Sequence, residues 1–131
     1  MKIADVVRLA GGVICLTGGP DGPINRPVVD GQMPIARGRI AKLMEAFGDR
    51  LYIELQRHDV PGEKQAEAHL IDLAYELAIP LVATNECYFA KAEDYEAHDA
   101  LICIAEGRYV TEDNRRRLTP DHYFKSAAEM A

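Results

Sequence analysis

The polar side chains that follow two short apolar segments are the part of this sequence best suited to chemistry. His58 follows the apolar segment 51–55, and Glu86 follows the apolar segment 81–84. The carboxyl ends of parallel strands meet at one rim of a sheet, so these two side chains could approach one another. Imidazole and carboxylate groups are expected ligands of zinc, manganese or iron. The pair is therefore a candidate metal site.

Further polar side chains surround this pair in the sequence. We expect the rim of the site to hold the following residues: Glu54, Arg57, Asn85 and Tyr88, with Gln56 and Cys87 nearby. A catalytic metal normally takes three protein ligands, so two ligands leave the site incomplete. On the alternative interpretation, His58 is an imidazole hydrogen-bonded at a strand end. No nucleophile elbow or H-E-x-x-H motif is present, and we assign no catalytic residue.

Two other histidines receive structural interpretations. Asp94 and His98 lie four residues apart and share one face of a predicted helix, where we expect a surface pair. His122 lies in Pro120-Asp121-His122-Tyr123, which is typical of a turn.

The elements that must position these side chains alternate along the chain. We predict strands at 13–17, 51–55 and 81–84, and helices at 3–10, 35–47, 63–78 and 94–105. This order predicts an α/β fold with about three parallel strands and flanking helices. Because a closed parallel barrel needs about eight strands, the sheet is either open or part of a larger barrel. The almost wholly apolar segment 13–17 predicts a strand covered on both faces.

Three of the predicted helices carry apolar residues at helical spacing, and we expect these faces to be buried. The faces are Ile40, Leu43, Met44 and Phe47; Ala66, Leu70, Leu73, Ala74 and Leu77; and Ala97, Leu101, Ile104 and Ala105.

The segments between these elements are turns and loops. Residues 18–27 are dense in glycine and proline and predict a long turn, with phosphate binding by backbone amides as the less favoured alternative. Residues 108–131 predict an irregular tail, in which Ser126 and Glu129 have the spacing of a capping box. The basic run 115–117 predicts a solvated loop, with a phosphate or partner contact as the alternative.

Composition bounds the class of protein. The chain has 131 residues and a net charge of −6, which opposes unaided binding to nucleic acid. No apolar run approaches the roughly 20 residues that span a bilayer, so we expect a cytoplasmic protein without membrane contact. Cys15 and Cys103 lie in apolar strings and predict core positions, whereas Cys87 could be exposed. The wide cysteine spacing suits a reducing compartment.

Five ordered segments together resemble one known family. They are residues 16–23, 52–58, 82–89, 94–101 and 118–126. They resemble the polymerase-and-histidinol-phosphatase (PHP) domain of the alpha subunits of bacterial replicative DNA polymerase III. The resemblance implies that residues 1–131 are the C-terminal part of a distorted seven-stranded (β/α) barrel, hence one incomplete domain.

The resemblance also implies where metal ligands would lie. Metal-binding members carry His, Asp, Glu and Cys ligands at the strand ends, and the His-x-His pair that opens this cluster is absent here. His58 falls at or near a ligand position, and the last Asp-x-His pair matches Glu86 and Tyr88. A phenol that titrates near 10 is a poor metal ligand at neutral pH. The resemblance thus implies no cofactor in this segment, and at most weak zinc or manganese binding in the full domain.

Three functions follow as hypotheses. The first is a fragment of the replicative polymerase, inactive alone, that supports the polymerase core and attachment of the proofreading subunit and meets DNA only through the full chain. The second is an independent PHP-like metal-dependent phosphoesterase that uses His58 and Glu86. The third is an interaction module that uses the arginine-rich loop. A partial barrel exposes apolar sheet edges, so we expect the isolated chain to self-associate or to be marginally stable.

Overall fold

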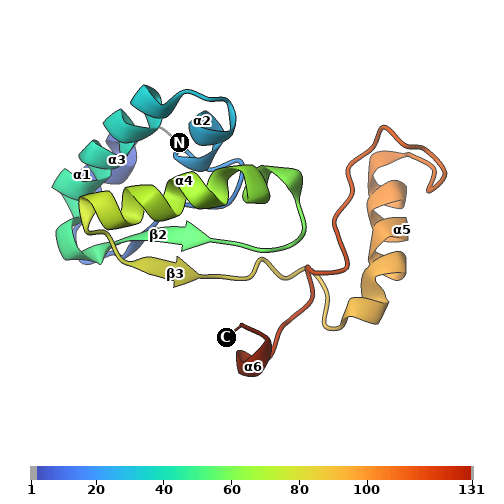
Figure 1. The fold of residues 1–131 in the computed structure, drawn as a ribbon. Helices are drawn as coiled ribbons and strands as arrows, with labels where there is room; N and C mark the ends of the chain where they lie inside the picture. The colour runs from blue at the N-terminus through green and yellow to red at the C-terminus, as the bar shows by residue number, and fades with distance from the viewer. Residues whose placement is uncertain (1–2, 131) are drawn as a thin grey trace. The chain divides into compact units, whose positions relative to one another are not determined.

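A computed structural model describes residues 3–130 of the chain. The chain divides into two compact units (Figure 1). The first unit contains residues up to 56 together with 61–83, and the second contains 57–60 together with the residues from 84 onward.

The first unit is built on a parallel sheet. Its strands are β1 (Cys15–Leu16), β2 (Leu51–Leu55) and β3 (Leu81–Ala83), in the order β1-β2-β3. Cys15 pairs with Leu51 on one side of β2, and Ile53 pairs with Leu81 on the other. The predicted α/β fold with three parallel strands is confirmed.

Helices connect the strands, as parallel pairing requires. Between β1 and β2 lie α2 (Asn25–Val29), α3 (Met33–Phe47) and the 3₁₀ turn η1 (Gly48–Arg50), and between β2 and β3 lies α4 (Pro61–Leu77). The helix α1 (Ile3–Arg8) precedes β1. The helix α4 forms the crossover from β2 to β3 and lies along both strands (Figure 1). Both α3 and α4 contact β2, so the core lies between these helices and the central strand.

The core confirms the predicted apolar faces of α3 and α4. Its buried members include Ile40, Leu43 and Phe47 from α3; Ala66, Leu70, Leu73 and Ala74 from α4; and Leu51 and Ile53 from β2. Met44 and Leu77 are partly buried and pack against this cluster.

The prediction that segment 13–17 is covered on both faces is wrong for the described chain. Only Cys15–Leu16 is a strand, and Val13, Ile14 and Leu16 are 51%, 63% and 42% exposed. Within residues 3–130, β1 pairs only with β2, so its far edge meets solvent. Cys15 is accordingly only partly buried, rather than a core residue as predicted.

The prediction of one long turn at 18–27 is also partly wrong. The short helix α2 begins at Asn25, inside that range. Ile24 is fully buried and Val28 is 5% exposed, so this apolar pair draws the end of the turn into the core. In the sequence, the many glycine and proline residues of 18–27 predicted a turn. The helical spacing of Ile24 and Val28 is too short a pattern to predict a helix against them.

The second unit consists of short elements joined by loops. They are η2 (Ala92–Asp94), α5 (Tyr95–Glu106) and α6 (Ala127–Met130). Phe89 and Tyr123 form an isolated parallel bridge, which places the segment after β3 beside the chain that precedes α6. Ser126 donates its backbone N–H to the Glu129 carboxylate at 2.8 Å, as the predicted capping box requires.

The predicted buried face of α5 is wrong. Leu101 and Ile104 are 62% and 76% exposed, while the buried side chains of the helix are Ile102 and Cys103. The reason is Asp99, which lies on the inward side and pairs with Arg115 from the following loop. Leu101 and Ile104 lie on the opposite side of the helix from this polar pair by helical spacing, and both are exposed. The core position predicted for Cys103 is confirmed.

Within residues 3–130, no helix is both long and apolar enough to cross a bilayer.

Candidate functional site

His58 and Glu86 meet within the second unit, through the backbone of Glu86. The Glu86 N–H donates to Nε2 of His58 at 3.1 Å, and Oδ1 of Asn85 lies 2.9 Å from the same nitrogen. His58 is only 1% exposed. The sequence predicted that these two residues approach one another, because both follow strand ends. It did not predict that the backbone amide of Glu86, rather than its carboxylate, makes the contact.

The second partner of Nε2 is held firmly in place. Asn85 donates Nδ2–H to the Tyr123 carbonyl at 2.7 Å, which fixes its oxygen toward His58. The Lys125 ammonium lies 3.4 Å from that oxygen. Two protein groups thus compete for one ring nitrogen, and a nitrogen engaged in this way has no free lone pair for a metal.

His122 stacks on His58. The ring centroids are 4.2 Å apart with an interplanar angle of 18°, and His122 is 5% exposed. The Thr119 backbone N–H donates to Nδ1 of His122 at 3.2 Å, and the Thr119 hydroxyl donates to the His58 carbonyl. Sequence reasoning placed His122 in a turn and missed this role. No periodic pattern surrounds it, and its aromatic neighbours were the only hint of burial.

Glu86 and Tyr88, which the resemblance matched to a metal-ligand pair, bind each other. The Tyr88 hydroxyl donates to Oε1 of Glu86 at 2.6 Å. This hydrogen bond, with some help from burial and despite the nearby Arg116, raises the pKa of Tyr88 above its usual value near 10. The phenol therefore stays protonated at neutral pH and occupies one oxygen of the carboxylate. Cys87, between them, is exposed as predicted.

The expected rim is divided between the two units. Arg57, Asn85 and Tyr88 belong to the second unit with His58, whereas Glu54 belongs to the first. The Glu54 carboxylate accepts the Gly18 N–H at 2.9 Å and the Gln56 amide at 3.2 Å. An internal carboxylate thus binds the first amide of the glycine-rich turn, which disfavours a phosphate there.

Two side chains of the arginine-rich loop, Arg115 and Arg117, form hydrogen bonds to neighbouring protein groups. The prediction of a solvated loop is therefore wrong for Arg115. Its guanidinium forms two 2.6 Å hydrogen bonds to Asp99, and the two side chains are 1% and 13% exposed. This pairing lowers the pKa of Asp99. Arg117 donates to the Val110 carbonyl at 3.3 Å.

His98 is half-buried rather than part of a surface pair with Asp94. Its ring lies 5.4 Å from the Phe89 ring and 5.7 Å from the Tyr88 ring, measured between centroids. The Asp94 carboxylate accepts the Lys91 backbone N–H at 3.1 Å.

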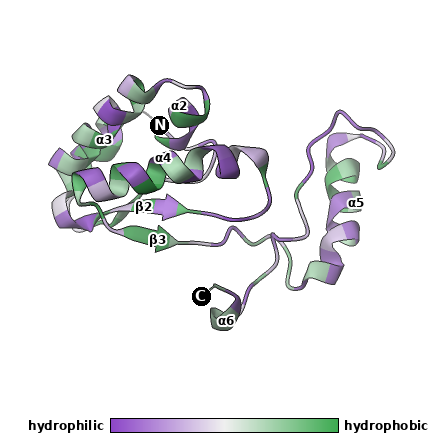
Figure 2. Cartoon of the chain, viewed as in Figure 1, coloured by the Kyte–Doolittle hydropathy of each residue, from purple (hydrophilic) through white to green (hydrophobic). Residues whose placement is uncertain are grey.

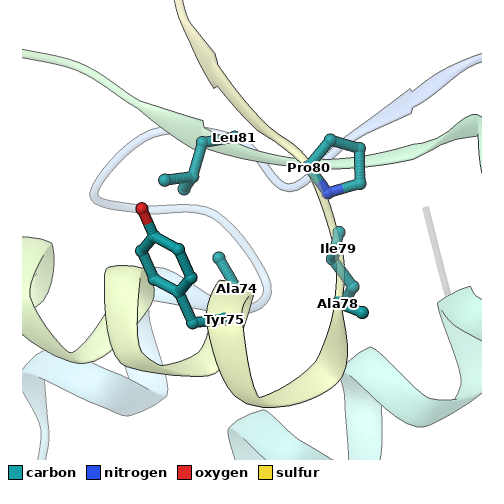
Figure 3. A pocket seen from close by; sticks show the side chains of 6 residues that line it. All are labelled: Ala74, Tyr75, Ala78, Ile79, Pro80 and Leu81. Atoms are coloured by element: carbon teal, nitrogen blue, oxygen red, sulfur yellow. The ribbon is translucent and has the colours of Figure 1, made fainter.

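A surface pocket of about 560 Å³ opens in the first unit (Figure 3). It is lined by Ala74, Tyr75, Ala78, Ile79, Pro80 and Leu81, at the turn from α4 into β3. These side chains are apolar apart from the phenol of Tyr75, so the lining carries no carboxylate, imidazole, thiol or amine for catalysis.

Comparison with known proteins shows what this chain is similar to. The family model for the PHP domain matches residues 3–58. DNA polymerase III subunit alpha of Caulobacter vibrioides is 48% identical over 127 residues, covering 97% of this chain and 11% of that protein. The Pseudomonas aeruginosa subunit is 38% identical over 127 residues, covering 96% and 11%. This chain is similar to a segment of DNA polymerase III subunit alpha. The resemblance read from the sequence is confirmed.

The match to DNA polymerase III subunit alpha extends well past the PHP model. The model ends at His58, whereas the subunit of Borreliella burgdorferi still matches 96% of this chain at 31% identity. Most of the His58 environment, including Asn85 and His122, therefore lies in sequence shared with alpha subunits outside the PHP model. The chain spans about a tenth of the length of the curated relatives it matches, 11% in the Caulobacter case.

A metal centre needs at least three ligand side chains that converge on one point. Within residues 3–130, no group of three or more His, Cys, Asp or Glu side chains is arranged to hold a metal ion. Nε2 of His58 and Oε1 of Glu86 are each engaged by a neighbour. The described residues therefore do not form a metal centre by themselves.

Proposed function

We propose that this chain is a segment of the alpha subunit of a bacterial replicative DNA polymerase, in which it acts as a structural scaffold without metal chemistry of its own. The full chain would carry out template-directed DNA synthesis, and this segment alone would be inactive. Similarity to alpha subunits over 97% of the chain supports the parent assignment.

One observation carries the scaffold role: the candidate ligands hold each other. Tyr88 occupies the Glu86 carboxylate, and Asn85 with the Glu86 amide occupies His58. The buried imidazole of His58, which is satisfied internally, rigidifies the structure around it, whereas a metal site needs lone pairs converging on one point. The Tyr88–Glu86 hydrogen bond lies at the exposed surface. The arrangement supports a degenerate metal site that now joins segments 58, 85–88 and 119–123.

The partners proposed for this scaffold are protein surfaces. They are the rest of the polymerase chain and, in the assembled enzyme, the proofreading subunit. The net charge of −6 supports contact with DNA only through other parts of the full chain. A replication enzyme would work in the cytoplasm.

The parent assignment is tested by the size of the native protein. An antibody raised against this segment would be applied to extracts of the source cells, and the detected protein assayed for template-directed DNA synthesis. We expect a band many times heavier than the 14.5 kDa of this chain. A band at 14.5 kDa would contradict the proposal.

An independent phosphoesterase is the second candidate, because the second unit gathers His58, His122 and Glu86 in one place. It would require ligands from another chain. Stoichiometric zinc or manganese in the purified protein, together with phosphodiester cleavage, would favour it over the scaffold.

A further inference from the structure

The helix α5 carries an exposed apolar stripe, and the exposed Glu96 and Glu106 lie outside it. Ala97, Leu101, Ile104 and Ala105 follow one another at intervals of four, three and one residues and are all exposed, Leu101 at 62% and Ile104 at 76%. We call these four residues the α5 apolar face. The acidic residues of the helix, Glu96, Asp99 and Glu106, lie off this stripe by helical spacing. Figure 2 shows the hydrophobic residues of α5 alternating with polar ones along the ribbon.

This arrangement departs from the usual amphipathic helix. A surface helix normally buries its apolar stripe and exposes its charges. In α5 the carboxylate of Asp99 points inward to Arg115, and Ile102 and Cys103 complete the inward side. The loop that supplies Arg115 runs back along the helix (Figure 1). The helix is therefore held on the side of Asp99, Ile102 and Cys103, which leaves the α5 apolar face exposed to a partner.

We propose that the α5 apolar face is an intramolecular docking surface, covered in the full-length polymerase chain by an apolar segment of the same polypeptide outside residues 1–131. This inference rests on the proposed function. The relatives support a segment of the same polypeptide as the occupant of this surface. This chain corresponds to only 11% of the Caulobacter subunit, so most of such a polypeptide lies outside the matched region and is available to cover the face.

The small size of the face favours a tethered occupant over a second copy. A helix of 12 residues is about 18 Å long and about 10 Å wide, which gives a footprint of about 200 Å². A stable complex between separate proteins usually buries about 800 Å² on each partner. A segment of the same chain avoids most of the entropy cost of association, so a smaller contact suffices.

Site-specific cysteine labelling tests this proposal. Ile104→Cys and the matched control Glu106→Cys place a thiol on the same last turn, on and off the face. Each variant is made in the 131-residue chain and in the full-length chain, exposed to a maleimide, and read by peptide mass spectrometry so that the native cysteines are resolved. We expect both thiols to react equally fast in the 131-residue chain. In the full-length chain we expect Ile104→Cys to react at least 10-fold more slowly than Glu106→Cys.

Two outcomes would overturn the proposal. Equal labelling of the two thiols in a full-length chain that synthesises DNA would mean that the face stays open, and would leave the proposed function intact. Selective protection of Ile104→Cys already in the 131-residue chain would mean that a second copy or the first unit covers it. Failure to find a longer native chain would instead remove the proposed function itself.

Discussion

At the residue scale, the central feature is that the side chains predicted as candidate metal ligands are bound to protein groups. Nε2 of His58 either accepts the Glu86 N–H or donates to Oδ1 of Asn85, and the ring stacks on His122. The imidazole of His58 therefore contributes to folding through packing and hydrogen bonding, and its Nε2 is not open to a reacting group. The consequence can be measured directly.

We predict that His58→Ala has no activity to remove. The purified chain should hold well under one equivalent of zinc or manganese by elemental analysis, and should not cleave phosphodiesters. The substitution should lower stability instead, by about 2–4 kcal/mol, because it removes a buried, hydrogen-bonded side chain. Reproducible cleavage by the native chain that this substitution abolishes would overturn the prediction.

A second residue-scale prediction concerns Glu129. Hydrogen bonds from Ser126, then from Tyr123, lower the pKa of this carboxyl to about 2, from an ordinary value of 4.5. Because the folded pKa is depressed, the ionised form stabilises α6 above pH 4.5, and that contribution is lost as the pH falls from 4.5 toward 2. An NMR titration of the Glu129 side chain should show the low midpoint. Tyr123→Phe should move the midpoint upward, and an unchanged midpoint in this variant would contradict the assignment.

At the element scale, helix ends and interiors make opposite demands on glycine. Gly107 caps α5 with a φ of 64°, a left-handed conformation that other residues adopt at a cost. Gly38 lies inside α3, where an added methyl group would meet open space.

We therefore predict effects of opposite sign for two Gly→Ala substitutions. Gly107→Ala should destabilise the chain by about 1 kcal/mol, through left-handed strain. Gly38→Ala should stabilise it by about 0.5–1 kcal/mol, because alanine loses less conformational entropy in a helix. Urea unfolding followed by circular dichroism would measure both. Effects of the same sign would argue against the assigned end of α5 or the assigned interior of α3.

At the scale of the whole molecule, the sheet has two unpaired edges within the described chain. Both β1 and β3 pair only with β2, and Leu16 and Leu81 are 42% and 38% exposed. Figure 2 shows β3 as a hydrophobic strand at one of these edges. Such edges favour association with other strands.

We predict that the isolated 131-residue chain self-associates as its concentration rises. Light scattering over a hundredfold range of concentration should show a growing mean mass. Leu81→Lys, on the β3 edge, should reduce this growth, whereas Lys42→Arg on α3 should not change it. A monomer at every concentration would show that the edges are harmless.

Agreement between sequence and structure was best where patterns are local and repeated. The stripes of α3 and α4 identified Ile40, Leu43, Leu70 and Leu73 as core residues. It was poorest where one long-range partner decides the outcome. The side of α5 that faces inward depends on Arg115, and the burial of His122 depends on stacking with a residue far away in the sequence.

The sequence by itself determined the α/β class, the order of elements and the similarity to polymerase alpha subunits, because periodicity and ordered motifs are properties of the chain alone. Only the tertiary structure decided what the polar groups do. Tyr88 and Glu86 could be read as altered metal ligands, but their mutual hydrogen bond appears only when the backbone is placed. Whether a polar side chain binds a ligand or a neighbouring residue depends on which groups lie within hydrogen-bond distance in the folded chain. Spacing along the sequence does not specify those groups.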